Sequence, residues 1–137
     1  MTDEASTERR PKQVIVMRKD LNMRKGKMIA QGAHASMKVL LDRGASSPDG
    51  TSYTFALTDA MHPWIVTGRF AKVTVGVTSE AELDDIVARA RAAGLPVALI
   101  IDSGKTEFHG VPTKTCCAVG PAWTDDVDAI TGALPLL

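Results

Sequence analysis

Two short, uninterrupted runs of apolar residues constrain the fold of this chain more than any other feature. They are Val14–Met17 and Val97–Ile101, and neither contains a polar residue. Such runs are typical of strands that are buried on both faces of a sheet, as in α/β proteins. A third strand is predicted around residues 70–77, where valine alternates with lysine, threonine and glycine.

Helical patterns connect these strands. Residues 26–44 predict a helix that ends at Gly44, with an apolar stripe that we expect to face the sheet. That stripe consists of Ile29, Ala30, Ala33, Met37, Leu40 and Leu41. Ser79 and Glu82 have the spacing of a capping box and predict the start of a second helix, which ends at Gly94. Its expected buried stripe is Leu83, Ile86, Val87 and Ala90.

The rest of the chain completes one domain. A further strand is predicted at about 115–119, and Thr124 is predicted to cap a short helix that ends near Gly132. The predicted fold class is α/β: a single compact domain with a small four-stranded mixed, mostly parallel sheet and helices on both faces, in the order β-α-β-α-β-β-α. A chain of 137 residues, 45% of them hydrophobic, can bury the core of one such domain.

Polar segments set the expected boundaries. Residues 1–11 are charged and polar, so we expect a flexible N-terminal tail ahead of a domain over 12–137. The first residues lack the apolar stretch of a secretory signal, and no apolar run approaches the ~20 residues of a membrane span. We therefore expect a cytoplasmic protein without membrane contact. Residues 45–63 follow no clear pattern, and both a lid and a spacer are open interpretations.

The cysteines and histidines do not predict a metal site. Cys116 and Cys117 are adjacent, so on a strand their side chains point to opposite faces and cannot form an ordinary disulfide. The pair lacks the C-x-x-C spacing of metal and redox motifs. His34, His62 and His109 have no ligand spacing with one another or with the cysteines. We expect no metal and no cofactor.

The formal net charge of zero conceals an asymmetry along the chain. Residues 9–43 hold ten Lys and Arg against two Asp, a local balance of +8. Residues 79–137 hold four Lys and Arg against nine Asp and Glu, a balance of −5. A basic half on a neutral chain indicates either a side that binds a polyanion or a merely solvated helix face.

Two polar segments follow predicted strands, where open α/β sheets place their ligands. The first runs from Arg18 to Lys27 into the start of the first helix, a terminus that attracts anions. The second is residues 102–106, where Asp102 either orients a water with the neighbouring hydroxyls or caps a turn. From the topology we infer that Lys27 lies near Asp102 and stabilises negative charge there. His34 is interpreted as a packing residue rather than a base.

Read together, these segments resemble the archaeal and eukaryotic-type (class 2) peptidyl-tRNA hydrolases. The resemblance extends from about Lys12 to the end of the chain. The matching residues are Arg18, Asp20-Leu21, Met23-Arg24-Lys25-Gly26-Lys27, Ala30-Gln31 and His34-Ala35, then Ala93-Gly94-Leu95-Pro96, Leu99-Ile100, Asp102-Ser103-Gly104-Lys105-Thr106 and Val119-Gly120-Pro121.

The resemblance implies hydrolysis of the ester that joins a peptide to the terminal ribose of tRNA, without metal or cofactor. It implies that the catalytic residues are Lys27, Asp102, Thr106 and Thr115, with Thr113 as a rival of Thr115. The residues expected to bind tRNA are Arg18, Lys19, Arg24, Lys25 and Lys105. Those expected to support the site are Gln31, His34 and His109. The expected partner is peptidyl-tRNA, and a homodimer is a further expectation.

Two other readings stay open. One is a non-catalytic α/β module that binds tRNA or a protein through the basic face, because a fold alone does not establish an activity. Asp102 argues against it, since a carboxylate at a phosphate site repels the ligand. The other is hydrolysis or transfer on a different acyl ester.

Overall fold

The structure is a computed structural model that describes residues 9–105 and 107–137. Its centre is a four-stranded sheet in the order β4-β1-β6-β5. These strands are β1 (Pro11–Arg18), β4 (Lys72–Val77), β5 (Val97–Asp102) and β6 (Thr113–Trp123). Strands β1 and β4 pair in parallel, whereas β6 is antiparallel to both β1 and β5. The predicted four-stranded mixed sheet is confirmed.

Three strands of the sheet share one direction, but only one pair is parallel. The chain returns from β5 to β6 through a loop with no crossover helix, so β6 runs the opposite way and lies between β1 and β5. The carboxyl ends of β1 and β5 therefore meet at the same edge of the sheet.

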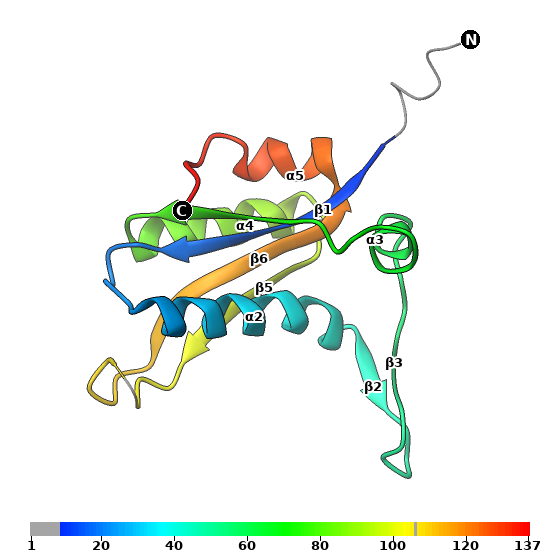
Figure 1. Cartoon of the computed structure of the whole chain (residues 1–137), viewed down its shortest axis with the longest axis horizontal. Coiled ribbons are helices and arrows are strands. Elements are labelled where there is room, and N and C mark those ends of the chain that lie inside the picture. Colours follow the sequence, from blue (N-terminus) through cyan, green and yellow to red (C-terminus); the bar gives the residue numbers. More distant parts are fainter. Residues whose placement is uncertain (1–8, 106) are drawn as a thin grey trace.

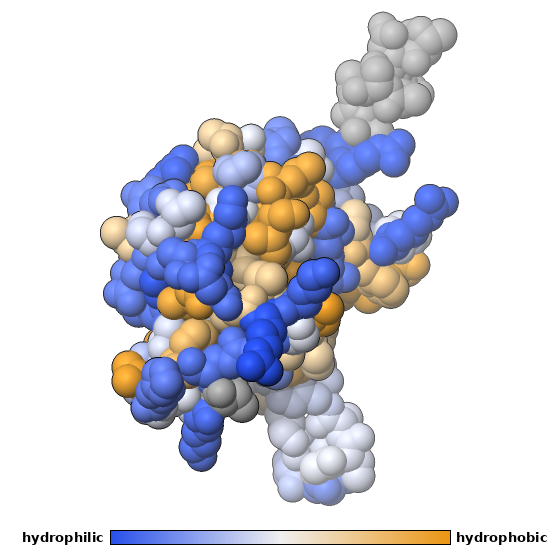
Figure 2. Space-filling model, turned by 60° about the vertical axis from the view of Figure 1, so that its left-hand side comes forward, coloured by the Kyte–Doolittle hydropathy of each residue, from blue (hydrophilic) through white to orange (hydrophobic). Residues whose placement is uncertain are grey.

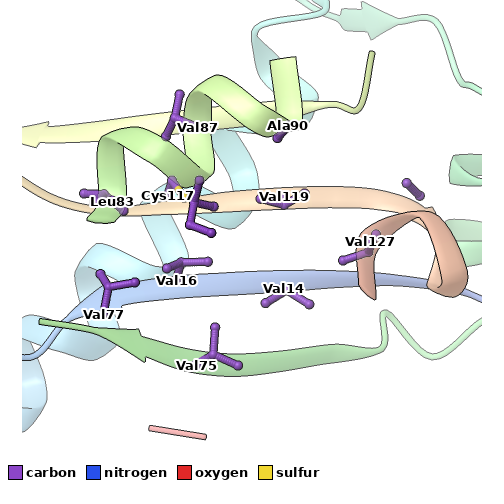
Figure 3. Close-up of a cluster of buried hydrophobic side chains, with 12 residues drawn as sticks. Val14, Val16, Val75, Val77, Leu83, Val87, Ala90, Cys117, Val119 and Val127 are labelled. Carbon is purple, nitrogen blue, oxygen red and sulfur yellow. The ribbon is translucent and has the colours of Figure 1, made fainter. Parts of the chain in front are cut away.

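Helices cover both faces of the sheet, as predicted (Figure 1). On one face lie α4 (Glu80–Ala92) and α5 (Thr124–Thr131). They enclose a core that includes the valines of β1 and β4 together with Leu83, Val87, Ala90, Cys117 and Val127 (Figure 3). The predicted capping box is formed at the start of α4, where Ser79 Oγ accepts a hydrogen bond from Glu82 N at 3.0 Å. All four residues of the predicted stripe are buried.

On the other face, α2 (Lys25–Leu41) packs on β5, β6 and β1. Cys116 belongs to this core and Cys117 to the opposite one, so the predicted arrangement of the two free thiols on opposite faces is confirmed. Burial raises the pKa of Cys116 to about 11, so this thiol stays protonated at neutral pH.

The predicted buried face of α2 is wrong. Ile29 is 73% exposed and Met37 60% exposed. The residues that face the sheet are instead Gln31, Gly32, Ala35, Ser36 and Val39. Gly32 lies against β1: a Cβ added to it would be 3.6 Å from the Ile15 side chain, an ordinary van der Waals distance. Apolar residues surround most of this helix, so their spacing did not identify the side that packs.

Three further expectations are corrected. Strand β5 is not buried throughout, because it is the edge strand and Ile101 is 59% exposed. Gly44 does not end α2, which stops at Leu41, but begins β2 (Gly44–Ser46). Thr124 is the first residue of α5 rather than its cap, and its hydroxyl donates to the Arg10 carbonyl at 2.8 Å. The expected tail, 1–11, lies mostly outside the described residues.

The segment that followed no pattern forms a hairpin of β2 and β3 (Tyr53–Phe55) and the short helix α3 (Met61–Val66). Gly44 allows close pairing in this hairpin, because an added Cβ would lie 2.3 Å from the Thr54 carbonyl oxygen. The hairpin follows the end of α2 (Figure 1). At about 1.5 Å per residue, that end lies about 20 Å along the helix from Lys27. The hairpin does not cover the residues discussed next. Among the described residues, no helix could cross a bilayer.

Candidate active site

The structure brings Lys27 and Asp102 into direct contact. Lys27 lies in the first turn of α2, and Asp102 is the last residue of β5. Lys27 Nζ donates to Asp102 Oδ1 at 2.9 Å, and the two side chains are only 14% and 12% exposed. The proximity inferred from the topology is confirmed.

The Asp102 carboxylate is held from several sides. Oδ1 also accepts a hydrogen bond from Gln31 Nε2 at 3.3 Å, and Oδ2 accepts one from the Gly104 backbone N–H at 2.9 Å. The hydrogen bond from Lys27 lowers the pKa of Asp102 below its ordinary value, against the opposing effect of burial. The carboxylate is therefore ionised at neutral pH and fixed in orientation.

A bulge in β6 brings Thr115 into this network. Ile100 pairs with Cys116 but Ile101 pairs with Lys114, so Thr115 is an extra residue in its strand. Bulges redirect side chains in this way. Thr115 is fully buried, and its hydroxyl donates to Gln31 Oε1 at 2.6 Å. This arrangement makes Thr115 a positioning residue for Gln31, which in turn contacts Asp102.

The other two candidate threonines are Thr113 and Thr106. Thr113, the rival of Thr115, is half-buried and donates its hydroxyl to the Val111 carbonyl at 2.8 Å. Thr106 lies outside the described residues, so its expected catalytic role stays a prediction.

The bond from the Gly104 N–H to Asp102 fits one of the two roles expected for Asp102, the capping of a turn. One group of the site was missed by the sequence analysis. It is Phe108, whose ring centroid lies 5.8 Å from Lys27 Nζ. The ring packs on the α2 side of the core. Gly104 has a φ of +84°, and its carbonyl accepts the Gly110 N–H at 2.9 Å. The loop is thereby folded back beside the lysine.

Four of the five expected tRNA-binding residues are exposed: Lys19, Arg24, Lys25 and Lys105. Arg18 is not, because it is buried and donates to Asp20 Oδ2 at 2.6 Å and to the Lys114 carbonyl at 3.0 Å. The bond from Arg18 to Asp20 lowers the pKa of that carboxyl and holds the loop that precedes α2. We therefore leave Arg18 out of the proposed tRNA surface.

Among residues 9–105 and 107–137, none of the three histidines forms a hydrogen bond with Lys27, Gln31, Asp102 or Thr115. His34 is exposed on α2, so its interpretation as a packing residue is wrong. The cause is the same as for the helix as a whole, because the spacing of the apolar residues did not identify the side of α2 that packs. His109 is exposed, with a φ of +52°, at a turn in the 103–112 loop. No group of three or more His, Cys, Asp or Glu within 9–105 and 107–137 is arranged to hold a metal.

Thr115→Val is expected to lower kcat about tenfold and to destabilise the fold by about 1–3 kcal/mol, because it leaves the buried Gln31 Oε1 without its donor. Thr115→Ser keeps the hydroxyl and should restore most of kcat. Steady-state kinetics and thermal unfolding of both variants would check this. A serine variant as slow as the valine variant would contradict the positioning role.

The fold and the site define a small α/β protein with a lysine–carboxylate centre at the edge of its sheet. A family model described as peptidyl-tRNA hydrolase PTH2 matches residues 11–137. The chain is 42% identical to the peptidyl-tRNA hydrolase of Methanocaldococcus jannaschii and 39% identical to that of Metallosphaera sedula, covering 92% of this chain and 99% of each relative. The chain belongs to the PTH2 family of peptidyl-tRNA hydrolases.

A solved structure supports the fold alone. It is a protein of unknown function, Atu0240 from Agrobacterium tumefaciens, with a TM-score of 0.56 and 13% sequence identity. The similarity covers 92% of this chain and 96% of that one.

Proposed function

We propose that the protein hydrolyses the ester between a peptide and the 3′-terminal ribose of tRNA, and that the Lys27–Asp102 pair is the centre of this reaction. The observation that carries the proposal is the 2.9 Å contact between these two side chains in a chain of the PTH2 family. A lysine beside an ionised carboxylate can stabilise developing negative charge and orient a water at the same place.

In the proposed reaction, the oxygen of a water bonds to the ester carbonyl carbon and the bond from that carbon to the ribose oxygen breaks. One proton of the water passes to the ribose oxygen, which leaves as a hydroxyl, and the other is released to solvent, so that the peptide leaves as a carboxylate. Negative charge develops on the carbonyl oxygen during the attack, and the Lys27 ammonium stabilises it.

The lowered pKa of Asp102 argues for one role over another. A carboxylate with a low pKa is a weak general base, since efficient proton acceptors have a pKa near the working pH. Asp102 therefore acts mainly by orienting Lys27 and the attacking water. Within residues 9–105 and 107–137, the carboxylate accepts three hydrogen bonds, and an ionised carboxylate offers about four lone-pair sites. The family resemblance implies a role for Thr106 as well, and we propose that its hydroxyl binds the same water.

Exposed basic residues lie on the segments before α2 and after β5. Lys19, Arg24, Lys25 and Lys105 would contact the phosphates of the tRNA. The helix α2 also begins without a side-chain cap at Arg24, where an anion is favoured. We place the enzyme in the cytoplasm, where tRNA is used, and the homodimer stays a prediction.

The test is single-turnover hydrolysis of N-acetyl-aminoacyl-tRNA, with unblocked aminoacyl-tRNA as the control and EDTA present throughout. We expect the blocked substrate to be cleaved and the unblocked one to be spared. Absence of cleavage with tRNA still bound in a salt-dependent way would overturn the proposal in favour of a binding module.

A further inference from the structure

An apolar groove lies on the opposite flank of α2 from the Lys27–Asp102 pair. It has a volume of about 440 Å³. Its floor is formed by Ile15 and Met17 of β1, and one wall by Met28 and Ile29 of α2. Leu137 forms the other wall, held against β4 by the hydrogen bond from its N–H to the Thr74 carbonyl at 3.1 Å.

The groove exists because α2 is placed to one side of the sheet. The helix packs mainly on β5 and β6, so part of the β1 and β4 surface on the same face stays open. Figure 2, which turns the side with the C-terminus toward the viewer, shows hydrophobic residues on this side bordered by hydrophilic ones. Ile29 stands at the groove with most of its surface exposed. A large exposed apolar residue beside an apolar hollow indicates a binding surface.

The groove and the proposed reaction centre share the first turns of α2. Lys25, Met28 and Ile29 line the groove, while Lys27 points the other way to Asp102. A helix with its side chains is about 10 Å across. An extended peptide advances roughly 3.3–3.6 Å per residue, so three or four residues would span from one flank to the other over the start of the helix. Gly26 lies on that path, and nothing is within 4 Å of the position that its side chain would occupy.

We propose that this groove binds apolar side chains of the peptide part of the substrate, three or four residues from the ester. The inference rests on the proposed function, because that function supplies the peptide. The lining suits a ligand of variable sequence, since methionine adapts its shape to different partners. Lys25 has the only charged side chain among the lining residues that the structure describes, and its ammonium can donate to a peptide carbonyl.

The test compares two substrates and two variants. The substrates are N-acetyl-leucyl-tRNA, which is too short to reach the groove, and N-acetyl-tetraleucyl-tRNA. For the unaltered protein we expect kcat/KM to be about tenfold higher for the longer substrate, the gain from burying one apolar side chain. In Ile29→Lys this ratio should fall to about one. Met37→Lys places the same charge on an exposed position of α2 outside the groove and should keep the ratio.

Three results would overturn the proposal: no preference for the longer substrate in the unaltered protein, an unchanged ratio in Ile29→Lys, or an equal loss in both variants. Sedimentation of the unaltered protein and Ile29→Lys provides a further check. The unaltered protein could sediment as a dimer and Ile29→Lys as a monomer, while the ratio of kcat/KM for the two substrates stays unchanged. That result would show that the groove binds a second copy of the chain.

Failure of the proposed function can be recognised separately, because neither substrate would then be cleaved. The groove is then tested with the free peptide N-acetyl-Leu-Leu-Ala-Ala-amide and methionine methyl groups labelled for NMR. The methyl signals of Met17 and Met28 should shift, while Met61, buried outside the groove, should not. Unmoved Met17 and Met28 signals at saturating peptide would overturn the proposal without reference to catalysis.

Discussion

Asp102→Asn is expected to lower the single-turnover rate on N-acetyl-aminoacyl-tRNA by about 10²–10³-fold, the largest effect of any single change considered. The amide keeps the size of the side chain but removes the charge that pairs with Lys27 and that we propose orients the attacking water. Losses of this size are typical when a group that orients a reacting water or a charge-stabilising donor is removed.

A matched control for this variant is Asp84→Asn. Asp84 also pairs with a lysine, Lys114, at 3.1 Å, but it lies on α4 away from the Lys27–Asp102 pair. The control should retain the rate of the unaltered protein within about twofold, because partly exposed ion pairs contribute little. Equal losses in the two variants would show that the loss comes from charge or stability in general.

The effect of pH on the free energy of unfolding provides a second test of Asp102→Asn. The folded-state pKa of Asp102 is lowered, so its ionised form stabilises the fold above the ordinary carboxyl pKa of about 3.9. That contribution is lost as the pH falls through the lowered folded-state pKa. The difference in unfolding free energy between the unaltered protein and Asp102→Asn should therefore shrink as the pH falls below about 4. Denaturant unfolding across this range would measure it.

The sequence was sufficient for those parts of the fold that depend on local chemistry. The capping box at Ser79 and the apolar stripe of α4 were predicted correctly, because one side of that helix is clearly polar. The contact between Lys27 and Asp102 was also predictable. It follows from two strands of the same direction ending at one edge of the sheet, which topology alone implies.

The errors arose where tertiary packing overrides local pattern. Apolar residues surround most of α2, so periodicity could not show that Gly32 and Ala35 face the sheet while Ile29 does not. The burial of Thr115 depends on a bulge, which no residue type in β6 indicated. The burial of Arg18 was likewise not visible in the sequence, because it depends on the pairing with Asp20 at the end of β1, and its expected role in tRNA binding stays a prediction.

Lys27 and Lys19 provide the last prediction, because they separate chemistry from binding. Lys27→Met is expected to lower kcat by about 10²-fold, since removing one donor from a developing oxyanion has costs of this order. Lys19→Met is expected to raise KM with kcat nearly unchanged, because Lys19 is exposed and we propose that it contacts a phosphate of the tRNA. Methionine is the appropriate replacement: the Lys19 stem covers Gly76, where an added Cβ would lie 2.3 Å from Lys19 Cδ, so an alanine would also remove packing.

The dependence on salt distinguishes the two lysines independently of the absolute rates. A residue that binds one phosphate contributes close to one unit to the slope of log K against log salt. Lys19→Met should therefore flatten the slope of log(1/KM) by about one, and Lys27→Met should flatten it much less. If Lys27→Met lost only binding and flattened the slope as Lys19→Met does, Lys27 would be a phosphate contact. The stabilisation of the transition state would then have to come from another group near Asp102, and the loop that carries Gly104 and Phe108 would be the first place to search for it.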